Sequence, residues 1–293
     1  MRCKAIRYDD TLAGLEQGCC QGRVMGVYER CFHLLLEDQR LVTVFGAAAD
    51  MMPLSICTDT TPDRPFASLK LLEGMRAGVC EGVLSVPAAG LFCRLGGEPI
   101  SLLRRPLPPP GRPAPFEAAL LRHGKRQGGG QCLPQWIESL RTGSPPPAAP
   151  EALARFAAFL TAVGGGGTEL REALWKTVGL GVGLTPSADD MICGAAAAAW
   201  LWWPKGLRSR FLGAILEFCR VQGRARTTLI SCQQMEQTAQ GRLSDPLYAL
   251  AECLSGGKDS LDRAVERVSA YGSSSGTELC MGLLAGLYVA TAC

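Results

Sequence analysis

The stretch GLGVGLTPSADDMICGAAAAAWLWWP, Gly179 to Pro204, decides the fold of the C-terminal half of this chain. In its first part glycine alternates with apolar residues, and its second part is an apolar run that Pro204 ends. Thr185 is well placed as a helix N-cap, because Pro186 follows it at the first helical position, where proline is favoured. We therefore predict a helix from Pro186 to near Trp203, preceded by a glycine-rich loop.

The apolar part of this stretch predicts a buried core helix. The run from Met191 to Trp203 is too short for a membrane span, which needs about 20 residues. The N-terminal residues MRCKAIRYDD contain no apolar segment typical of a secretory signal. We therefore expect a cytoplasmic protein with no membrane partner.

The composition is that of a folded chain with balanced charge. Its 293 residues are 47% hydrophobic and 19% charged, which excludes a disordered protein. With 30 basic and 27 acidic residues the net charge is +3, so no nucleic-acid partner and no membrane attraction are expected. The 14 cysteines contain no Cys-x-x-Cys pair, and His33 and His123 lie far apart, so zinc-finger spacing is absent. We expect the cysteines to be reduced and to serve as small apolar residues.

Three regions follow one another along the chain. Residues 1–105 are β-rich: two apolar runs flank the polar turn Glu37–Arg40, and Gly96-Gly97 is expected to form a second hairpin turn. Residues 106–150 form a proline-rich linker with short helices, because proline at this density continues neither a sheet nor a helix. Residues 151–293 contain amphipathic and apolar segments that predict helices. The predicted fold is α+β, an N-terminal antiparallel β barrel or sandwich-like domain followed by a mainly α-helical C-terminal domain.

The glycine-rich loop has the features of an anion-binding loop. Gly181 and Gly183 can adopt positive φ and bring the backbone close to a ligand, and N–H groups at the following helix N-terminus favour an anion. Asp189 and Asp190 lie in the first turns, where one aspartate would suffice to complement the helix dipole. Because a carboxylate repels phosphate, the second aspartate suggests either Mg²⁺, held by Asp189 or Asp190, or a substrate that bears an amide.

A second stretch of the chain resembles the first. SGTELCMGLLAGLY (275–288) matches SADDMICGAAAAAW (187–200), with Asp190 corresponding to Glu278 and a glycine at the same place in each. Both stretches follow a glycine-bearing loop, so two loop–helix units are expected to direct their polar ends to one site. Small residues one turn apart would let the two helices pack closely. Chance similarity between two helices rich in small residues is the alternative.

The segment GRARTTLIS (223–231) supplies further polar groups. Arg226 is a candidate clamp for a carboxylate or a phosphate, because a guanidinium binds such groups through two parallel hydrogen bonds. Thr227 and Thr228 supply hydroxyl groups beside it. The alternative is an ordinary helix start with its arginines in solvent.

These motifs together resemble a bacterial family. GLGVGLTPSADD is similar to the signature GLGPGLTPSGDD of the AllH-like family, and RTTLIS and GSSSGTELCMGLLAGL resemble its two later motifs. GRVMGVYERCFHLLLEDQRLVTVF resembles the β-rich start of the family, so the resemblance covers most of the chain in the same order. It implies a subunit of oxamate carbamoyltransferase in allantoin degradation, which converts oxalurate and phosphate to oxamate and carbamoyl phosphate. It also implies companion subunits, an FdrA-like protein among them.

The chain departs from the family motifs at three positions. Val182 replaces the common proline, Ala188 replaces a glycine, and Ser273 replaces a histidine. If the family histidine is a general acid–base, this chain has lost or replaced it. If the histidine only hydrogen-bonds a ligand, Ser273 can substitute for it.

The resemblance and the polar residues together imply a site for a small anionic ureide or carbamoyl phosphate. The catalytic candidates are Asp189, Asp190, Ser273 and Ser274. The candidates for binding substrate or phosphate are Gly181, Gly183, Thr185, Ser187, Arg226, Thr227, Thr228, Ser275, Gly276 and Thr277. Such a site needs an anion cradle, a clamp and donors to the developing oxyanion. The alternative is a non-catalytic metabolite-binding or assembly subunit of an FdrA-containing complex.

Overall fold

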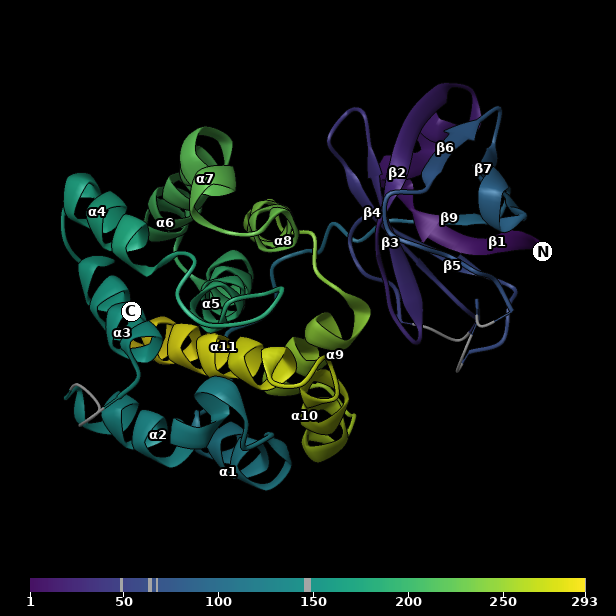
Figure 1. Cartoon of the computed structure of the whole chain (residues 1–293). Helices are drawn as coiled ribbons and strands as arrows, with labels where there is room; N and C mark the ends of the chain where they lie inside the picture. Colours follow the sequence, from purple (N-terminus) through teal and green to yellow (C-terminus); the bar gives the residue numbers. More distant parts are fainter. Residues whose placement is uncertain (48–49, 63–64, 67, 145–148, 293) are drawn as a thin grey trace. The chain divides into compact units, whose positions relative to one another are not determined.

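The computed structural model describes residues 1–47, 50–62, 65–66, 68–144 and 149–292. The chain forms two compact units, Met1–Leu102 and Leu103–Cys293 (Figure 1). The first unit holds the nine strands of the described chain and the second holds its α-helices, so the predicted α+β class is confirmed.

The first unit is a closed barrel. Strand β5 pairs with both β4 and β1, which closes eight strands in the order β1-β5-β4-β3-β2-β6-β7-β8, and β9 pairs with β1. Three pairings are parallel, those of β1 with β8, β1 with β9 and β4 with β5, and the others are antiparallel. The strands are β1 (Arg2–Asp9), β2 (Cys19–Val27), β3 (Cys31–Leu36), β4 (Leu41–Phe45), β5 (Ser55–Thr58), β6 (Arg76–Cys80), β7 (Val83–Val86), β8 (Leu91–Arg94) and β9 (Glu98–Ile100).

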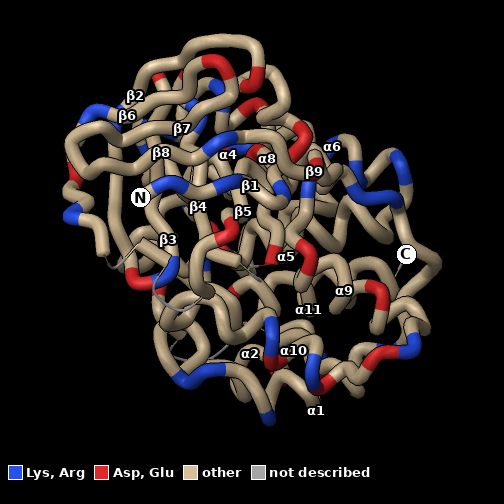
Figure 2. The backbone as a smooth tube through the Cα atoms, turned by 90° about the vertical axis from the view of Figure 1, so that its right-hand side faces the viewer, with Lys and Arg blue, Asp and Glu red and all other residues tan. Residues whose placement is uncertain are grey.

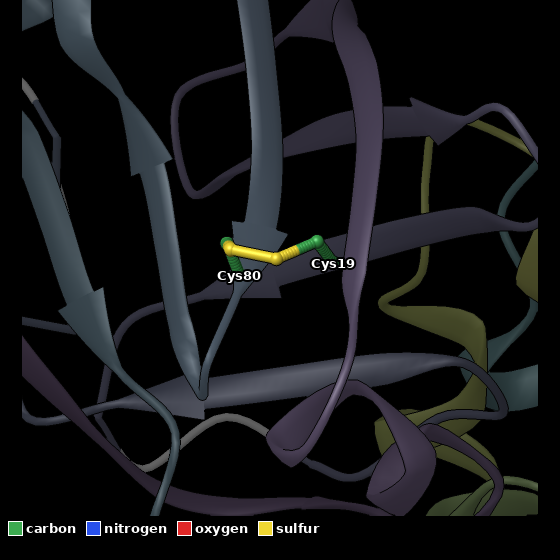
Figure 3. Close-up of a disulfide and its surroundings, with 2 residues drawn as sticks. All are labelled: Cys19 and Cys80. Carbon is green, nitrogen blue, oxygen red and sulfur yellow. A yellow bond between two sulfur atoms is a disulfide. The ribbon is translucent and has the colours of Figure 1, made fainter.

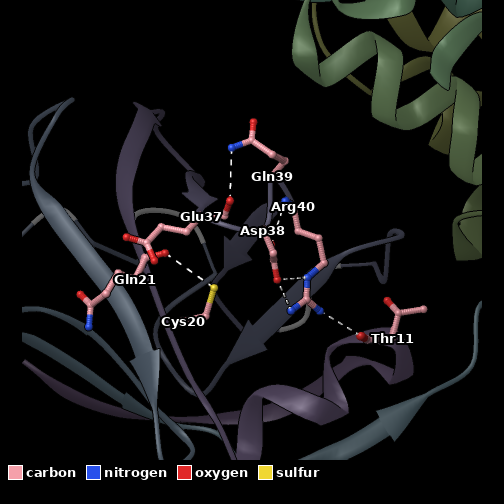
Figure 4. A network of polar contacts seen from close by, with 7 residues as sticks. All are labelled: Thr11, Cys20, Gln21, Glu37, Asp38, Gln39 and Arg40. Carbon is pink, nitrogen blue, oxygen red and sulfur yellow. Dashed lines mark hydrogen bonds and ion pairs between the residues drawn. The ribbon is translucent and has the colours of Figure 1, made fainter. Parts of the chain in front are cut away.

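The hairpin predicted around Glu37–Arg40 is confirmed. Strands β3 and β4 pair antiparallel, and residues 32, 34 and 36 of β3 are buried while those between them are half-buried, as alternation predicts. Gln39 holds a φ of 70° at the turn. Arg40 donates from Nε to Asp38 Oδ2 at 2.8 Å and from Nη1 to the carbonyl of Thr11 at 3.2 Å, which ties the turn to the 3₁₀ segment Asp10–Glu16 (Figure 4).

The hairpin predicted at Gly96-Gly97 is wrong. Strands β8 and β9 flank this turn but do not pair with each other, because both lie parallel to β1. A Cβ on Gly97 would lie 2.5 Å from the carbonyl oxygen of Ala5, so glycine is needed there for a close approach to β1. The local pattern showed a turn but not which strand the flanking residues meet.

The expectation that all cysteines are reduced is also corrected. Cys19 of β2 and Cys80 of β6 face each other in the antiparallel register, with Cα atoms 4.0 Å apart, and form a disulfide (Figure 3). The barrel pairing brings these two residues together across 61 positions of sequence. Among the described residues the other cysteines are free thiols, and all of them are buried or half-buried.

The second unit consists of helices around a buried centre. Its α-helices are α1 (Ala114–His123), α2 (Leu133–Thr142), α3 (Glu151–Ala162), α4 (Gly167–Thr177), α5 (Ser187–Trp202), α6 (Lys205–Phe218), α7 (Arg224–Arg226), α8 (Leu229–Ala239), α9 (Asp245–Leu254), α10 (Leu261–Ser269) and α11 (Ser275–Ala292). A 3₁₀ turn, η3 (Gly128–Cys132), precedes α2, and a π-helical turn, η4 (Cys219–Gly223), follows α6.

Helices α5 and α11 form the centre of this unit and lie against each other (Figure 1). A Cβ on Gly194 would lie 2.0 Å from the carbonyl oxygen of Leu279, and one on Gly282 would lie 1.9 Å from that of Met191. These contacts are reciprocal, since the two glycines correspond in the predicted repeat. The expected core helix and the close packing through small residues are therefore confirmed.

The two central helices run in the same direction, so their N-termini lie together. Gly282 approaches Met191 near the start of α5, and Gly286 approaches Ala195 and Ala198 further along it. The charged residues on these two helices are all acidic and lie in their first turns (Figure 2). Elsewhere basic and acidic residues are interspersed along the chain. No helix in the described part of the chain combines the length and hydropathy that a bilayer span requires.

Candidate functional site

The two loop–helix units meet at the N-termini of α5 and α11. The hydroxyl groups of Thr185 and Ser275, 90 positions apart in sequence, lie 2.7 Å from each other. The loop Gly179–Pro186 thus lies beside the start of α11, as the repeat predicted. The N-cap prediction needs a correction: α5 begins at Ser187 with Pro186 as its N-cap, and the Thr185 hydroxyl bonds across to Ser275 instead of capping the helix.

The glycine-rich loop carries a run of unused donors. Gly179, Gly181 and Gly183 have φ values of 83°, 124° and 101°, which favour glycine. A Cβ on Gly181 would lie 2.4 Å from the backbone nitrogen of Ser187. Within the described residues the N–H groups from Gly181 to Thr185 donate no hydrogen bond. Free backbone N–H groups are what an anion-binding loop requires.

Asp189 holds the loop in place. Its Oδ1 accepts a hydrogen bond from the N–H of Gly179 at 2.8 Å, and its Oδ2 accepts one from the hydroxyl of Thr227. Burial raises the pKa of Asp189, and the hydrogen bonds from Gly179 and Thr227 oppose that rise. Because both of its oxygens accept hydrogen bonds, Asp189 links the loop to the segment before α8.

Asp190 has an unused oxygen. Its side chain is 5% exposed, and its buried Oδ2 has no hydrogen-bond partner among the described residues. Burial, followed by the neighbouring Glu278, raises the pKa of Asp190 well above its usual value, whereas the hydroxyls of Ser275 and Thr185 lower it. A buried polar atom without a partner costs free energy, so this oxygen is suited to contact a ligand.

Glu278 lies opposite Asp190 and is fully buried. Its Oε1 accepts from the N–H of Gly129 at 2.7 Å, and Ser274 Oγ donates to its Oε2 at 3.1 Å. A Cβ on Gly128 would lie 2.6 Å from Glu278 Oε1. The sequence analysis did not identify the glycines at 128–130 as part of the site, although three consecutive glycines are a signal of close backbone approach.

Arg226, the predicted clamp, and its neighbour Thr228 both contact other segments of the protein. The Arg226 guanidinium lies 4.5 Å from the centre of the Trp175 ring and donates from Nη2 to the carbonyl of Trp175 at 3.0 Å, so it lies against α4. Thr228 is the N-cap of α8, where its hydroxyl accepts from the N–H of Ser231 and donates to the carbonyl of Leu184 at 2.6 Å. The segment 226–228 therefore fixes the position of the glycine-rich loop through the hydrogen bond of Thr228 to Leu184.

The segment from Ser273 to Thr277 is divided between surface and interior. Ser273 is exposed, while Thr277 is fully buried and its hydroxyl accepts from the backbone N–H of Lys125 at 2.8 Å. A Cβ on Gly276 would lie 2.0 Å from the carbonyl oxygen of Val268. Gly276 and Thr277 thus position the start of α11, and Ser187 is buried beneath Gly181.

Among the described residues no group of three or more histidine, cysteine, aspartate or glutamate side chains is arranged to hold an ion. Both oxygens of Asp189 accept hydrogen bonds from protein groups, so neither is free to contact an ion.

Comparison with known proteins identifies two matching family models. Residues 4–98 match the AllH family N-terminal domain, and residues 177–287 match oxamate carbamoyltransferase subunit AllH. The second match begins just before the glycine-rich loop and ends within α11, so it includes every residue of the site except those near Gly129. No solved structure matches the chain significantly.

Proposed function

This chain belongs to the AllH family of oxamate carbamoyltransferase subunits, and on that premise we propose that it takes part in the phosphorolysis of oxalurate to oxamate and carbamoyl phosphate. The observation that carries the proposal is the juxtaposition of five free loop N–H groups, Gly181 to Thr185, with the unpartnered Oδ2 of Asp190. The loop N–H groups suit a phosphate, and the free oxygen of Asp190 suits a substrate nitrogen.

In this reaction the protein mainly has to position the substrates, and little covalent catalysis by its side chains is needed. The loop N–H groups would hold the anion, and the hydroxyls of Thr185 and Ser275 would donate to the oxyanion that develops on the carbamoyl carbon. Asp190 would contact the ureide nitrogen, while Asp189 would keep the loop in shape. Ser273, exposed at the neighbouring loop, would bind ligand by hydrogen bonds only.

Companion subunits would complete the site. The substrates are anionic, yet Arg226 lies on Trp175, and Lys125 Nζ donates to the carbonyls of Ala270 and Gly272. The large apolar side chains exposed in the described helical unit are Leu103 and four others: Trp175 of α4, Val182 and Leu184 of the loop, and Val221 of η4. We propose that an FdrA-like subunit covers these four side chains and supplies positive charge. A non-catalytic binding or assembly subunit is the alternative that the same exposed surface favours.

Ligand-dependent thermal stability tests the binding site. We expect phosphate or carbamoyl phosphate at about 100 times its dissociation constant to raise the free energy of unfolding by about 2.7 kcal/mol. Oxalurate and oxamate are tested in the same way, with and without Mg²⁺. Gly181→Ala should abolish the shift, because the new Cβ would enter the space of the Ser187 nitrogen and a φ of 124° disfavours alanine. The matched control is Gly206→Ala, where the added Cβ meets nothing within 4 Å.

Two results would count against this binding site. One is a wild-type chain that no ligand stabilises, which moves the assembly-subunit alternative to first place. The other is a Gly181→Ala variant that keeps the wild-type shift, which places the ligand elsewhere.

Association with the companion subunit tests the proposed contact surface. Val182 and Leu184 are 87% and 52% exposed, so Val182→Ser/Leu184→Ser should leave the melting temperature unchanged. Loss of two apolar contacts at an interface should weaken binding to a co-expressed FdrA-like subunit by about tenfold or more. Leu103→Ser, at an exposed apolar residue elsewhere on the helical unit, is the control. If the double variant and the Leu103→Ser control bound the companion subunit equally well, Val182 and Leu184 would not belong to the interface.

A further inference from the structure

The carboxyl groups at the meeting point of α5 and α11 differ in what remains available to a substrate. Asp189 and Glu278 each have both oxygens engaged by hydrogen bonds from protein groups. Asp190 is adjacent to Asp189 in sequence and interacts electrostatically with Glu278, and its Oδ2 is buried without a hydrogen-bond partner among the described residues. The hydroxyl pair of Thr185 and Ser275 lies beside the same carboxyl group.

We propose that Asp190 is the general acid that protonates the departing amide nitrogen when the ureide is cleaved. This role rests on the proposed phosphorolysis and adds to it the source of the proton. The buried, unpartnered oxygen of Asp190, the hydroxyls of Thr185 and Ser275 beside its carboxyl group and the absence of any other unused carboxylate oxygen in the described site assign the role to this residue.

Cleavage of oxalurate by phosphate requires a general acid. An oxygen of hydrogen phosphate forms a bond to the carbamoyl carbon of oxalurate, and the bond between that carbon and the inner nitrogen breaks. The nitrogen leaves as the amide of oxamate only if it gains a proton, because an amide anion is too basic to depart. Asp190 gives its proton to the nitrogen and regains one from the hydrogen phosphate, so charge and protons balance over the turnover.

The surroundings keep that proton on Asp190. The ionisable groups that act with it are Glu278 on α11 and Asp189 and Cys193 on α5, and none of them is basic. Burial and the charge of Glu278 raise the pKa of Asp190, so its acid form persists at a pH where an exposed aspartate is ionised. Glu278 is a positioning residue in this scheme, held by Gly129 and Ser274.

The test uses the complex of this chain with its companion subunits and follows oxamate formation from oxalurate and phosphate. For the wild type, kcat/KM should fall as the pH rises above the pKa of Asp190, since a general acid acts only when protonated. Asp190→Asn should lower the rate by a factor on the order of 10² to 10⁴ and abolish this alkaline decline, with KM for phosphate nearly unchanged. Asp190→Glu should restore part of the rate together with the decline.

A second measurement needs no turnover. Folded Asp190 binds its proton more tightly than the unfolded chain does, so this group stabilises the fold most at low pH and loses that contribution as the pH rises. The melting temperature of Asp190→Asn relative to the wild type should therefore increase with pH above about 4, the pKa of an unfolded aspartate. A variant that fails to fold, or a difference that does not change with pH, overturns the proposal.

The outcomes separate the two claims. A wild-type complex that converts oxalurate, combined with an Asn variant that keeps the rate or the alkaline decline, overturns the role of Asp190 and leaves the proposed function standing. A wild-type complex that never converts oxalurate overturns the proposed function, and the role of Asp190 with it.

Discussion

Gly282→Ala is expected to lower the free energy of unfolding by about 3 kcal/mol, the upper end of what overpacking a core costs. The added Cβ would lie 1.9 Å from the carbonyl oxygen of Met191, a backbone atom that cannot rotate away. Helices α5 and α11 would have to separate along their whole contact, because Gly194 meets Leu279 in the same way on the other side. Chemical denaturation of the purified chain measures the loss.

Gly213→Ala is the control for this substitution. Gly213 lies within α6 with nothing within 4 Å of the added Cβ, so alanine should stabilise the chain by about 1 kcal/mol through helix propensity. Opposite signs for the two glycines are the expected result. A Gly282 variant as stable as the wild type would show that the two helices are not packed as described.

Asp189→Ala should lower the free energy of unfolding by about 3 kcal/mol. The change leaves the N–H of Gly179 and the hydroxyl of Thr227, both half-buried, without an acceptor, and an unsatisfied group costs about 1–3 kcal/mol when it is buried. Because burial raises the pKa of Asp189, the wild type loses part of this advantage as the pH rises above the unfolded value. The deficit of the variant should therefore shrink with increasing pH, as thermal melts across a pH series would reveal.

Asp262→Ala is the matched control for the buried aspartate. Asp262 accepts from Arg122 and His123, but its side chain is 46% exposed, and exposed ion pairs contribute little. The stability of this variant should stay close to that of the wild type. If both aspartate variants lost the same stability, Asp189 would not be the link that the structure indicates.

The barrel shows which parts of the fold local sequence patterns can predict. The alternation in Cys31–Leu36 predicted a strand with one buried face, and the polar residues after it predicted the hairpin. The same reasoning failed at Gly96-Gly97, because β8 and β9 meet β1, which lies about ninety residues away in sequence. A turn signal shows that the chain bends, but the partner of each strand depends on closure of the whole barrel.

The site shows the same division. The sequence alone determined the glycine-rich loop, the core helix behind it, the correspondence of Asp190 with Glu278 and the small residues at which the helices meet, because helical periodicity and glycine conformation are local properties. Only the tertiary structure decided which carboxylate is left unpaired. Asp189 and Asp190 are adjacent and chemically identical, yet Thr227 and Gly179 occupy the first while Glu278 faces the second. Those neighbours come from other segments of the chain, and burial brings them together.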